Sequence, residues 1–189
     1  DNSSGTRGGA IYNGDTDITI NGKGEFSGNS SKSGGAVYNL DASGNTKFTT
    51  GTGTTFTNNT ATSTGGAITN YDGTVNIGAN NKFSGNTAKW GGAIYNSSWQ
   101  GSATTNIAGG TSFTNNSATD EGGAIYVYDN AKVNIDTTAG NVVFSSNTAK
   151  QGSDIYLDGE NSELIVNGTN KNNKVTFGSE KSIAGDGKI

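Results

Sequence analysis

The chain has 189 residues, enough for one domain of ordinary size, and a formal net charge of −4 from 12 basic and 16 acidic residues. It has no basic run, and its longest apolar stretches hold only three or four residues, which excludes a nucleic-acid-binding protein and an inserted membrane helix. Because cysteine is absent, disulfides and thiolate metal sites are excluded as well.

The first recurring element is Gly-Gly-Ala-Ile. Full copies span 8–11, 65–68, 91–94 and 122–125, Val ends the copy at 34–37, and the copy at 152–155 has decayed to Gly-Ser-Asp-Ile. The six copies start 26, 31, 26, 31 and 30 residues apart. Each Gly pair predicts a corner with a positive φ or a close backbone approach. Period-two alternation predicts that the last residue of each copy points inward, giving a column of Ile11, Val37, Ile68, Ile94, Ile125 and Ile155.

The opposite parity is predicted to face outward. It covers the Ala of each element, which is replaced by Asp154 in the last copy, and the residue after each Ile or Val. These following residues are Tyr12, Tyr38, Thr69, Tyr95, Tyr126 and Tyr156.

The second element is an alternating strand at 17–20, 74–77, 104–107, 132–135 and 163–166, with a poor version near 46–48. Its inward residues are predicted to form a second apolar column of Ile20, Ile77, Ile107 and Ile135.

The third element is Phe-x-x-Asn, which lies 8 or 9 residues before the next Gly pair. Its aromatic residues predict an inward column of Phe26, Phe56, Phe83, Phe113 and Phe144, continued by Phe177. Its amides predict a structural ladder of Asn29, Asn59, Asn86, Asn116 and Asn147, each hydrogen-bonded to its copies above and below.

Three short strand-like segments per repeat, with no helical pattern between them, predict an all-β fold. One repeat is too small to bury its own apolar face, whereas stacked repeats bury a continuous core. We therefore expect a single domain over residues 1–189, a parallel β-helix of about five to six three-stranded coils of 26–31 residues each.

Gly-Gly-Ala-[Ile/Val] and Phe-x-x-Asn, alternating in constant order over residues 8 to 156, resemble the passenger region of the chlamydial polymorphic outer membrane proteins and related autotransporter adhesins. The resemblance implies a right-handed β-helix that is displayed outside the cell and used for adhesion. The chain departs from many chlamydial members in having no cysteine.

The acidic residues offer two kinds of site. Carboxylate pairs occur at Asp15/Asp17, Asp120/Glu121 and Glu160/Glu163, but all fall in polar corners and no histidine is present, so we expect no catalysis. An Asp column follows the Gly pairs at Asp15, Asp41, Asp72 and Asp129. Stacked carboxylates attract Ca²⁺, which makes Asp41, Asp72 and Asp129 a weak calcium candidate. The alternative is that Asp simply favours turns. No cofactor is expected.

Aromatic residues near one coil form the candidate contact site. Trp90 precedes a Gly pair at a variable position, and Trp99 lies in the loop after the strand of Tyr95. Trp90, Tyr95 and Trp99 are predicted to form a contact patch for a sugar or a protein, the alternative being a loop clasp.

The sequence thus favours an extracellular, non-catalytic segment of a longer bacterial surface protein, in keeping with the absence of methionine and of a signal peptide. The expected partner is a cell-surface protein or glycan, with neither nucleic-acid binding nor membrane insertion. One alternative is a subunit that stacks end to end into an extracellular filament. A lesser alternative is a polysaccharide-active β-helix enzyme.

Overall fold

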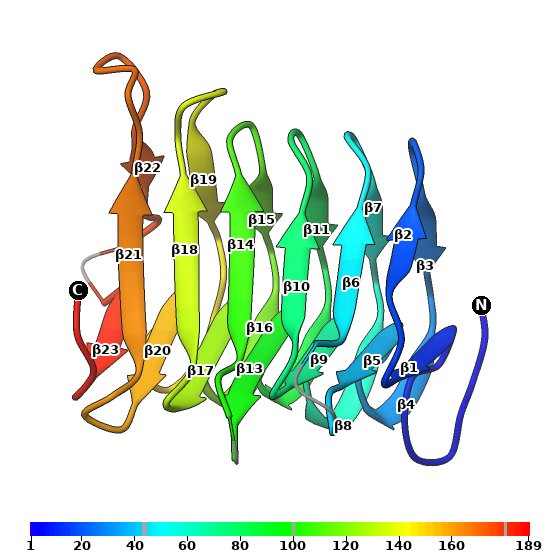
Figure 1. Cartoon of the computed structure of the whole chain (residues 1–189). Coiled ribbons are helices and arrows are strands. Elements are labelled where there is room, and N and C mark those ends of the chain that lie inside the picture. Colours follow the sequence, from blue (N-terminus) through cyan, green and yellow to red (C-terminus); the bar gives the residue numbers. More distant parts are fainter. Residues whose placement is uncertain (43–44, 100, 180) are drawn as a thin grey trace.

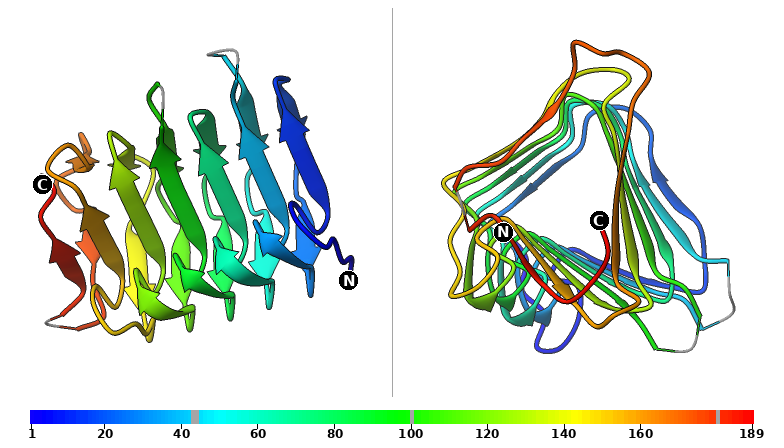
Figure 2. Two further views of the ribbon diagram at one scale, coloured as in Figure 1. Left: turned by 90° about the horizontal axis from the view of Figure 1, so that it is seen from below. Right: turned by 90° about the vertical axis from the view of Figure 1, so that its left-hand side faces the viewer.

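The chain is a parallel β-solenoid of about six turns, seen in a computed structural model that describes residues 1–42, 45–99, 101–179 and 181–189. The described residues form 23 strands and no helix, and hence no helix that is long and apolar enough to cross a bilayer. Figure 1 shows the coils stacked side by side from the N-terminus to the C-terminus. Viewed along the stack, they enclose a roughly triangular outline (Figure 2).

The strands assemble into four sheets, each containing one strand from successive coils. Sheet I consists of β1 (Ile11–Gly14), β5 (Val37–Leu40), β9 (Ile68–Tyr71), β13 (Ile94–Ser98), β17 (Ile125–Asp129), β20 (Ile155–Asp158) and β23 (Ile183–Gly185). Sheet II consists of β2 (Ile18–Ile20), β6 (Lys47–Thr50), β10 (Thr74–Ile77), β14 (Thr104–Ala108), β18 (Lys132–Asp136) and β21 (Glu163–Asn167). Sheet III consists of β3 (Glu25–Ser27), β7 (Thr55–Thr57), β11 (Lys82–Ser84), β15 (Ser112–Thr114), β19 (Val142–Ser145) and β22 (Val175–Thr176). Sheet IV consists of β4 (Ser30–Ser33), β8 (Thr60–Thr64), β12 (Thr87–Trp90) and β16 (Ser117–Glu121).

Strand register follows the repeat. In sheet I, Ile94 pairs in parallel with Ile68 on one side and with Ile125 on the other. In sheet III, Phe83 pairs with Phe56 and Phe113. Equivalent residues therefore stack directly above one another, as the repeat spacing predicts.

The prediction of three strands per coil is wrong, because the strands of sheet IV add a fourth to most coils. Its strands lie between the Asn of Phe-x-x-Asn and the next Gly pair, a stretch predicted to be a polar corner. The inward residues of this stretch are small: Ser31, Ala61, Ala88 and Ala118 are all buried. Without large inward side chains the period-two signal is weak, and the segment resembles a loop in sequence.

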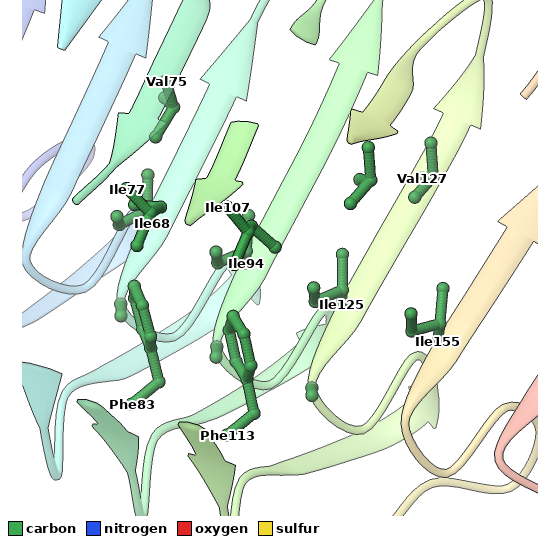
Figure 3. Packing of buried hydrophobic residues seen from close by; sticks show 14 of the residues in the cluster. Ile68, Val75, Ile77, Phe83, Ile94, Ile107, Phe113, Ile125, Val127 and Ile155 are labelled. Carbon is green, nitrogen blue, oxygen red and sulfur yellow. The ribbon is translucent and has the colours of Figure 1, made fainter. Parts of the chain in front are cut away.

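The core contains the predicted columns. Ile68, Ile94 and Ile125 are completely buried, whereas Ile11 is only half-buried because β1 is the terminal strand of sheet I. Figure 3 shows the isoleucines in a row from coil to coil, with the rings of Phe83 and Phe113 parallel to each other. Neighbouring rings from Phe26 to Phe144 stack with centroids 4.7 to 4.8 Å apart, the spacing of adjacent strands. Phe177 extends the stack, as predicted.

The Asn ladder is confirmed as a structural element. Asn86 donates from Nδ2 to Asn116 Oδ1 at 2.9 Å and to the carbonyl of Phe56 at 3.0 Å, while its Oδ1 accepts the backbone and side-chain N–H groups of Asn59. The same pattern links Asn29, Asn59, Asn86, Asn116 and Asn147. A second buried ladder, which the sequence reading missed, runs inside sheet I through Asn13, Asn39, Asn70 and Asn96.

The Gly pairs form tight bends. Gly65 has a φ of +59°, and a Cβ on Gly66 would collide with backbone atoms of Gly92 and Thr87 in the next coil. The prediction that the following Ala faces outward is wrong for the inner coils, since Ala36, Ala67, Ala93 and Ala124 are fully buried and Asp154 is buried too. Ala10, in the first coil, is exposed. The N–H groups of Ala67 and Ile68 donate to the same carbonyl of Ala93, so the Ala lies in the bend, where strand alternation has not begun.

Candidate ligand-binding face

A column of tyrosines covers the outer surface of sheet I. It contains all seven tyrosines of the chain: Tyr12, Tyr38, Tyr71, Tyr95, Tyr126, Tyr128 and Tyr156. Along its main line, successive ring centroids lie 5.2 to 5.7 Å apart. The outward direction is as predicted, but stacking leaves Tyr38, Tyr95 and Tyr126 less than a tenth exposed.

One coil departs from the repeat and keeps the column continuous. Thr69 occupies the usual tyrosine position in β9 and is buried. Tyr71, two residues later and so on the same face of the strand, places its ring between those of Tyr38 and Tyr95 at 5.6 and 5.7 Å. The pattern "Thr for Tyr, then Tyr two residues on" was visible in the sequence.

Three buried phenols of this column, those of Tyr38, Tyr95 and Tyr126, have a raised pKa. Burial raises the pKa of Tyr38 to about 12, although the positive charge of Arg7 acts in the opposite direction. Burial also raises the pKa of Tyr95 and of Tyr126, and the hydrogen bond from Tyr126 to Asp158 adds to the second shift. Arg7 lies over the Tyr38 ring, with its guanidinium carbon 5.0 Å from the ring centroid. At neutral pH these three hydroxyls are therefore uncharged, with the Arg7 cation beside Tyr38 and the Asp158 carboxylate beside Tyr126.

The corner that follows sheet I varies in length. The loop between β9 and β10 contains only Asp72 and Gly73, whereas the loops between β5 and β6 and between β13 and β14 are longer. These loops account for most of the extra length of the two 31-residue repeats. In Figure 2, the described parts of both longer loops project from the same corner of the triangle. The two loops belong to coils on either side of the short corner at Asp72.

A cleft lies between these two loops. It has a volume of about 820 Å³ and is lined by Leu40, Asp41, Ala42, Asn45, Lys47, Asp72, Thr74, Trp99, Gly101 and Ser102. A second hollow of about 240 Å³ adjoins it towards the tyrosine column and is lined by Arg7, Tyr38, Leu40, Tyr71, Asp72 and Trp99. We call these the loop cleft and the tyrosine hollow. They share Leu40, Asp72 and Trp99, and the Trp99 side chain is 76% exposed.

The Asp column provides acceptors that hold the corner backbone. Asp15, Asp72 and Asp129 each have a φ of +59°, the left-handed conformation of a turn residue. Asp15 Oδ1 accepts the N–H of Ala42 at 2.7 Å, and Asp41 Oδ2 accepts the N–H of Thr46 at 2.9 Å. Within the described ranges, no group of three or more His, Cys, Asp or Glu side chains is arranged to hold a metal ion. This geometry favours the turn interpretation, and the calcium site stays a prediction.

At least one carboxylate of each predicted acidic pair forms a hydrogen bond or an ion pair. Asp120 forms ion pairs with Lys150 at 2.5 Å and Lys89 at 3.7 Å, and the hydrogen bond from Lys150 is the main cause that lowers its pKa. Asp17 accepts the backbone N–H of Lys47, and Glu163 pairs with Lys132. These carboxylates bind neighbouring coils to one another.

The three predicted contact residues do not share one patch. Trp90 precedes β13 and Trp99 follows it, so the strand separates them by about 16 Å at roughly 3.3 Å per residue. Trp90 is half-buried and donates its indole N–H to Glu121 at 2.8 Å, under the ammonium group of Lys89. Tyr95 belongs to the tyrosine column, and only Trp99 lies at the cleft.

The sequence reading missed Arg7, Tyr38, Tyr71 and Lys47 as part of the site. Sequence reasoning placed Trp99 in a loop after the strand of Tyr95, but did not predict that this loop and the loop after β5 lie on either side of one coil.

Four segments of the chain match a known repeat, that of the Chlamydia polymorphic membrane protein, at residues 23–40, 53–71, 82–97 and 110–128. Each matched segment covers one strand each of sheets III, IV and I, with Phe-x-x-Asn near its start and Gly-Gly-Ala-[Ile/Val] near its end. Neither a curated protein nor a solved structure matches the chain. Together with the parallel β-solenoid, these matches fit a passenger-like surface protein, and the chain thus carries four copies of the Chlamydia polymorphic membrane protein repeat.

Proposed function

We propose that this chain is a non-catalytic adhesive segment of an extracellular bacterial surface protein, and that it binds host or neighbouring cells through the corner around Trp99. The single observation that carries the proposal is the 76% exposure of the Trp99 side chain between two adjoining hollows. An exposed tryptophan over a cleft is typical of a binding site, because its large rigid surface is available to a partner.

The solenoid supports this role as a rigid scaffold. The Phe stack and two Asn ladders fix each coil on its neighbours, so the outer corners accept longer loops without disturbing the core. We propose right-handed winding, the hand of about 98% of parallel crossover connections.

The engaged carboxylates support a binding role over the alternative of a polysaccharide-active enzyme. Asp17, Asp120 and Glu163 each contact a backbone N–H or a lysine of another coil, and the sequence contains no histidine. A glycosidase needs two carboxyl groups directed at one bond.

Binding of the purified chain to cells tests the proposal. Trp99→Ala is expected to weaken binding at least ~10-fold, as removal of a central aromatic contact does. The matched control is Trp90→Ala, which removes the other tryptophan, half-buried at the opposite end of β13. Its binding should stay within about 2-fold of the parent. Unchanged binding by a folded Trp99→Ala chain, with a parental circular dichroism spectrum, contradicts the proposal.

The filament is the second candidate. Sheet I begins with β1 and ends with β23, and within the described chain each of these strands is paired on one side only, so a second copy can add there. Solution mass and electron microscopy over a concentration series separate the candidates. Uniform filaments one solenoid wide favour the fibre, and short rods of constant mass favour the adhesive segment.

A further inference from the structure

We propose that the loop cleft and the tyrosine hollow together bind a neutral oligosaccharide, with a pyranose ring stacked on the indole of Trp99. This inference rests on the proposed function and names its ligand class. The hollows adjoin along Leu40, Asp72 and Trp99, so one elongated ligand passing Trp99 reaches both. At about 820 Å³, the loop cleft falls within the size range of small-ligand sites.

Trp99 is held in place before any ligand arrives. Its backbone N–H donates to Asp72 Oδ1 at 2.7 Å, and the same oxygen accepts Ser98 Oγ at 3.2 Å and the N–H of Gly101 at 3.3 Å. The carboxylate of one coil thus fixes the residues before and after Trp99 in the next coil, while the indole itself stays exposed. Because these bonds already hold the backbone of Trp99, a ligand loses little affinity to fixing this residue.

The remaining lining suits hydroxyl groups. Asn45, Lys47, Thr74 and Ser102 surround the cleft with hydrogen-bond donors and acceptors beside the aromatic surface. A pyranose has this same division, with an apolar C–H face that packs on an aromatic ring and a rim of hydroxyls.

The balance of charged side chains that line the two hollows favours a neutral sugar over an acidic one. Lys47 lines the loop cleft together with Asp41, and Arg7 lines the tyrosine hollow together with Asp72. Because Asp72 lines both hollows, the loop cleft holds one cation and two carboxylates, and the tyrosine hollow holds one of each. Neither presents the excess of positive charge that selects sulfated or carboxylated glycans.

A peptide ligand fits the site less well. Besides Trp99, the apolar lining of the cleft is limited to Leu40 and Ala42, too little for the apolar face of a helix. An added peptide strand needs a free sheet edge, whereas β5 pairs with β1 and β9, and β13 pairs with β9 and β17.

The test is an array of neutral and acidic oligosaccharides, followed by calorimetric titration of the strongest binder. The parent chain is expected to bind neutral glycans, and its affinity should change less than about 2-fold between ~50 and ~500 mM salt because the contacts are uncharged. Trp99→Ala should lose at least ~10-fold in affinity, whereas Trp99→Phe, which keeps a stacking surface, should lose clearly less. Trp90→Ala is the matched control and should bind as the parent does.

Three results overturn the inference: no glycan binding, binding of acidic glycans alone with a steep salt dependence, or equal affinity in Trp99→Ala. Binding to glycosidase-treated cells distinguishes the sugar-binding inference from the proposed adhesive function. If Trp99 is needed for cell binding but the chain binds treated and untreated cells equally, the adhesive function is supported and the sugar ligand is contradicted. If glycans bind through Trp99 but cells do not bind, the sugar site stands and adhesion is wrong.

Discussion

At the scale of single residues, asparagine occupies two kinds of ladder with different surroundings. The inner ladder through Asn59, Asn86 and Asn116 is fully buried, and each amide bonds to both neighbours and to a backbone carbonyl. An outer ladder on sheet II links Asn134 to Asn106 and Asn106 to Asn76, each at 2.8 Å, with the side chains half-buried. Water can replace the bonds of the outer ladder but cannot reach the inner one.

Asn86→Ala is therefore expected to reduce the free energy of unfolding by roughly 3 kcal/mol, because it leaves buried backbone and amide groups of the adjacent coils unpaired. Asn76→Ala, the outer counterpart, should cost about 1 kcal/mol or less. Urea unfolding followed by circular dichroism gives both values. Equal losses in the two variants would contradict the role assigned to burial.

At the scale of elements, the bend at each Gly pair fixes how one coil passes to the next. The first glycine supplies the positive φ, and the second allows the neighbouring coil to approach its Cα, as at Gly65 and Gly66. Sequence reasoning predicted both roles, since only glycine tolerates them. It placed Ala67 on the wrong side because it extended strand alternation into the bend.

Gly66→Ala is expected to destabilise the chain by about 3 kcal/mol or more, since the new Cβ meets backbone atoms of Gly92 and Thr87 that have no room to move. Gly5→Ala is the control, because nothing lies within 4 Å of a Cβ at that position and its φ is not positive. Thermal unfolding should show a large drop in Tm for the first variant and almost none for the second. A parental Tm for Gly66→Ala would mean that the coils separate more easily than their packing indicates.

At the scale of the whole molecule, the tyrosine column joins sheet I from β1 to β20 through ring contacts between coils. Tyr38, Tyr95 and Tyr126 have a phenol pKa above the unfolded value of 10.0 because burial disfavours the phenolate. Above pH 10 the native chain therefore binds more protons than the unfolded chain. Stability is complete below pH about 10 and decreases as the pH rises towards the folded pKa values.

Alkaline unfolding measures this effect. For each buried tyrosine, the free energy of unfolding should fall by up to about 1.4 kcal/mol per pH unit above pH ~10. Tyr38→Phe removes one such group, so the free energy of unfolding should fall less steeply, by about 1.4 kcal/mol per pH unit. The measurement is urea unfolding at pH 9 to 11.5, and an identical slope in Tyr38→Phe would contradict the assignment.

The sequence by itself determined the columns of this protein. Because the repeat places like residues one coil apart, Ile94, Phe83 and Asn86 could be assigned to the core and to a ladder from their spacing alone. It could not reveal sheet IV, whose inward residues Ala88 and Ala118 are too small to mark a strand.

Only the tertiary structure decided the site. Arg7, Lys47, Tyr71 and Trp99 lie in different coils. The loop lengths in the second and fourth coils, on either side of the short corner at Asp72, bring them to two adjoining hollows. Such a site depends on how coils stack in space, which no single repeat encodes.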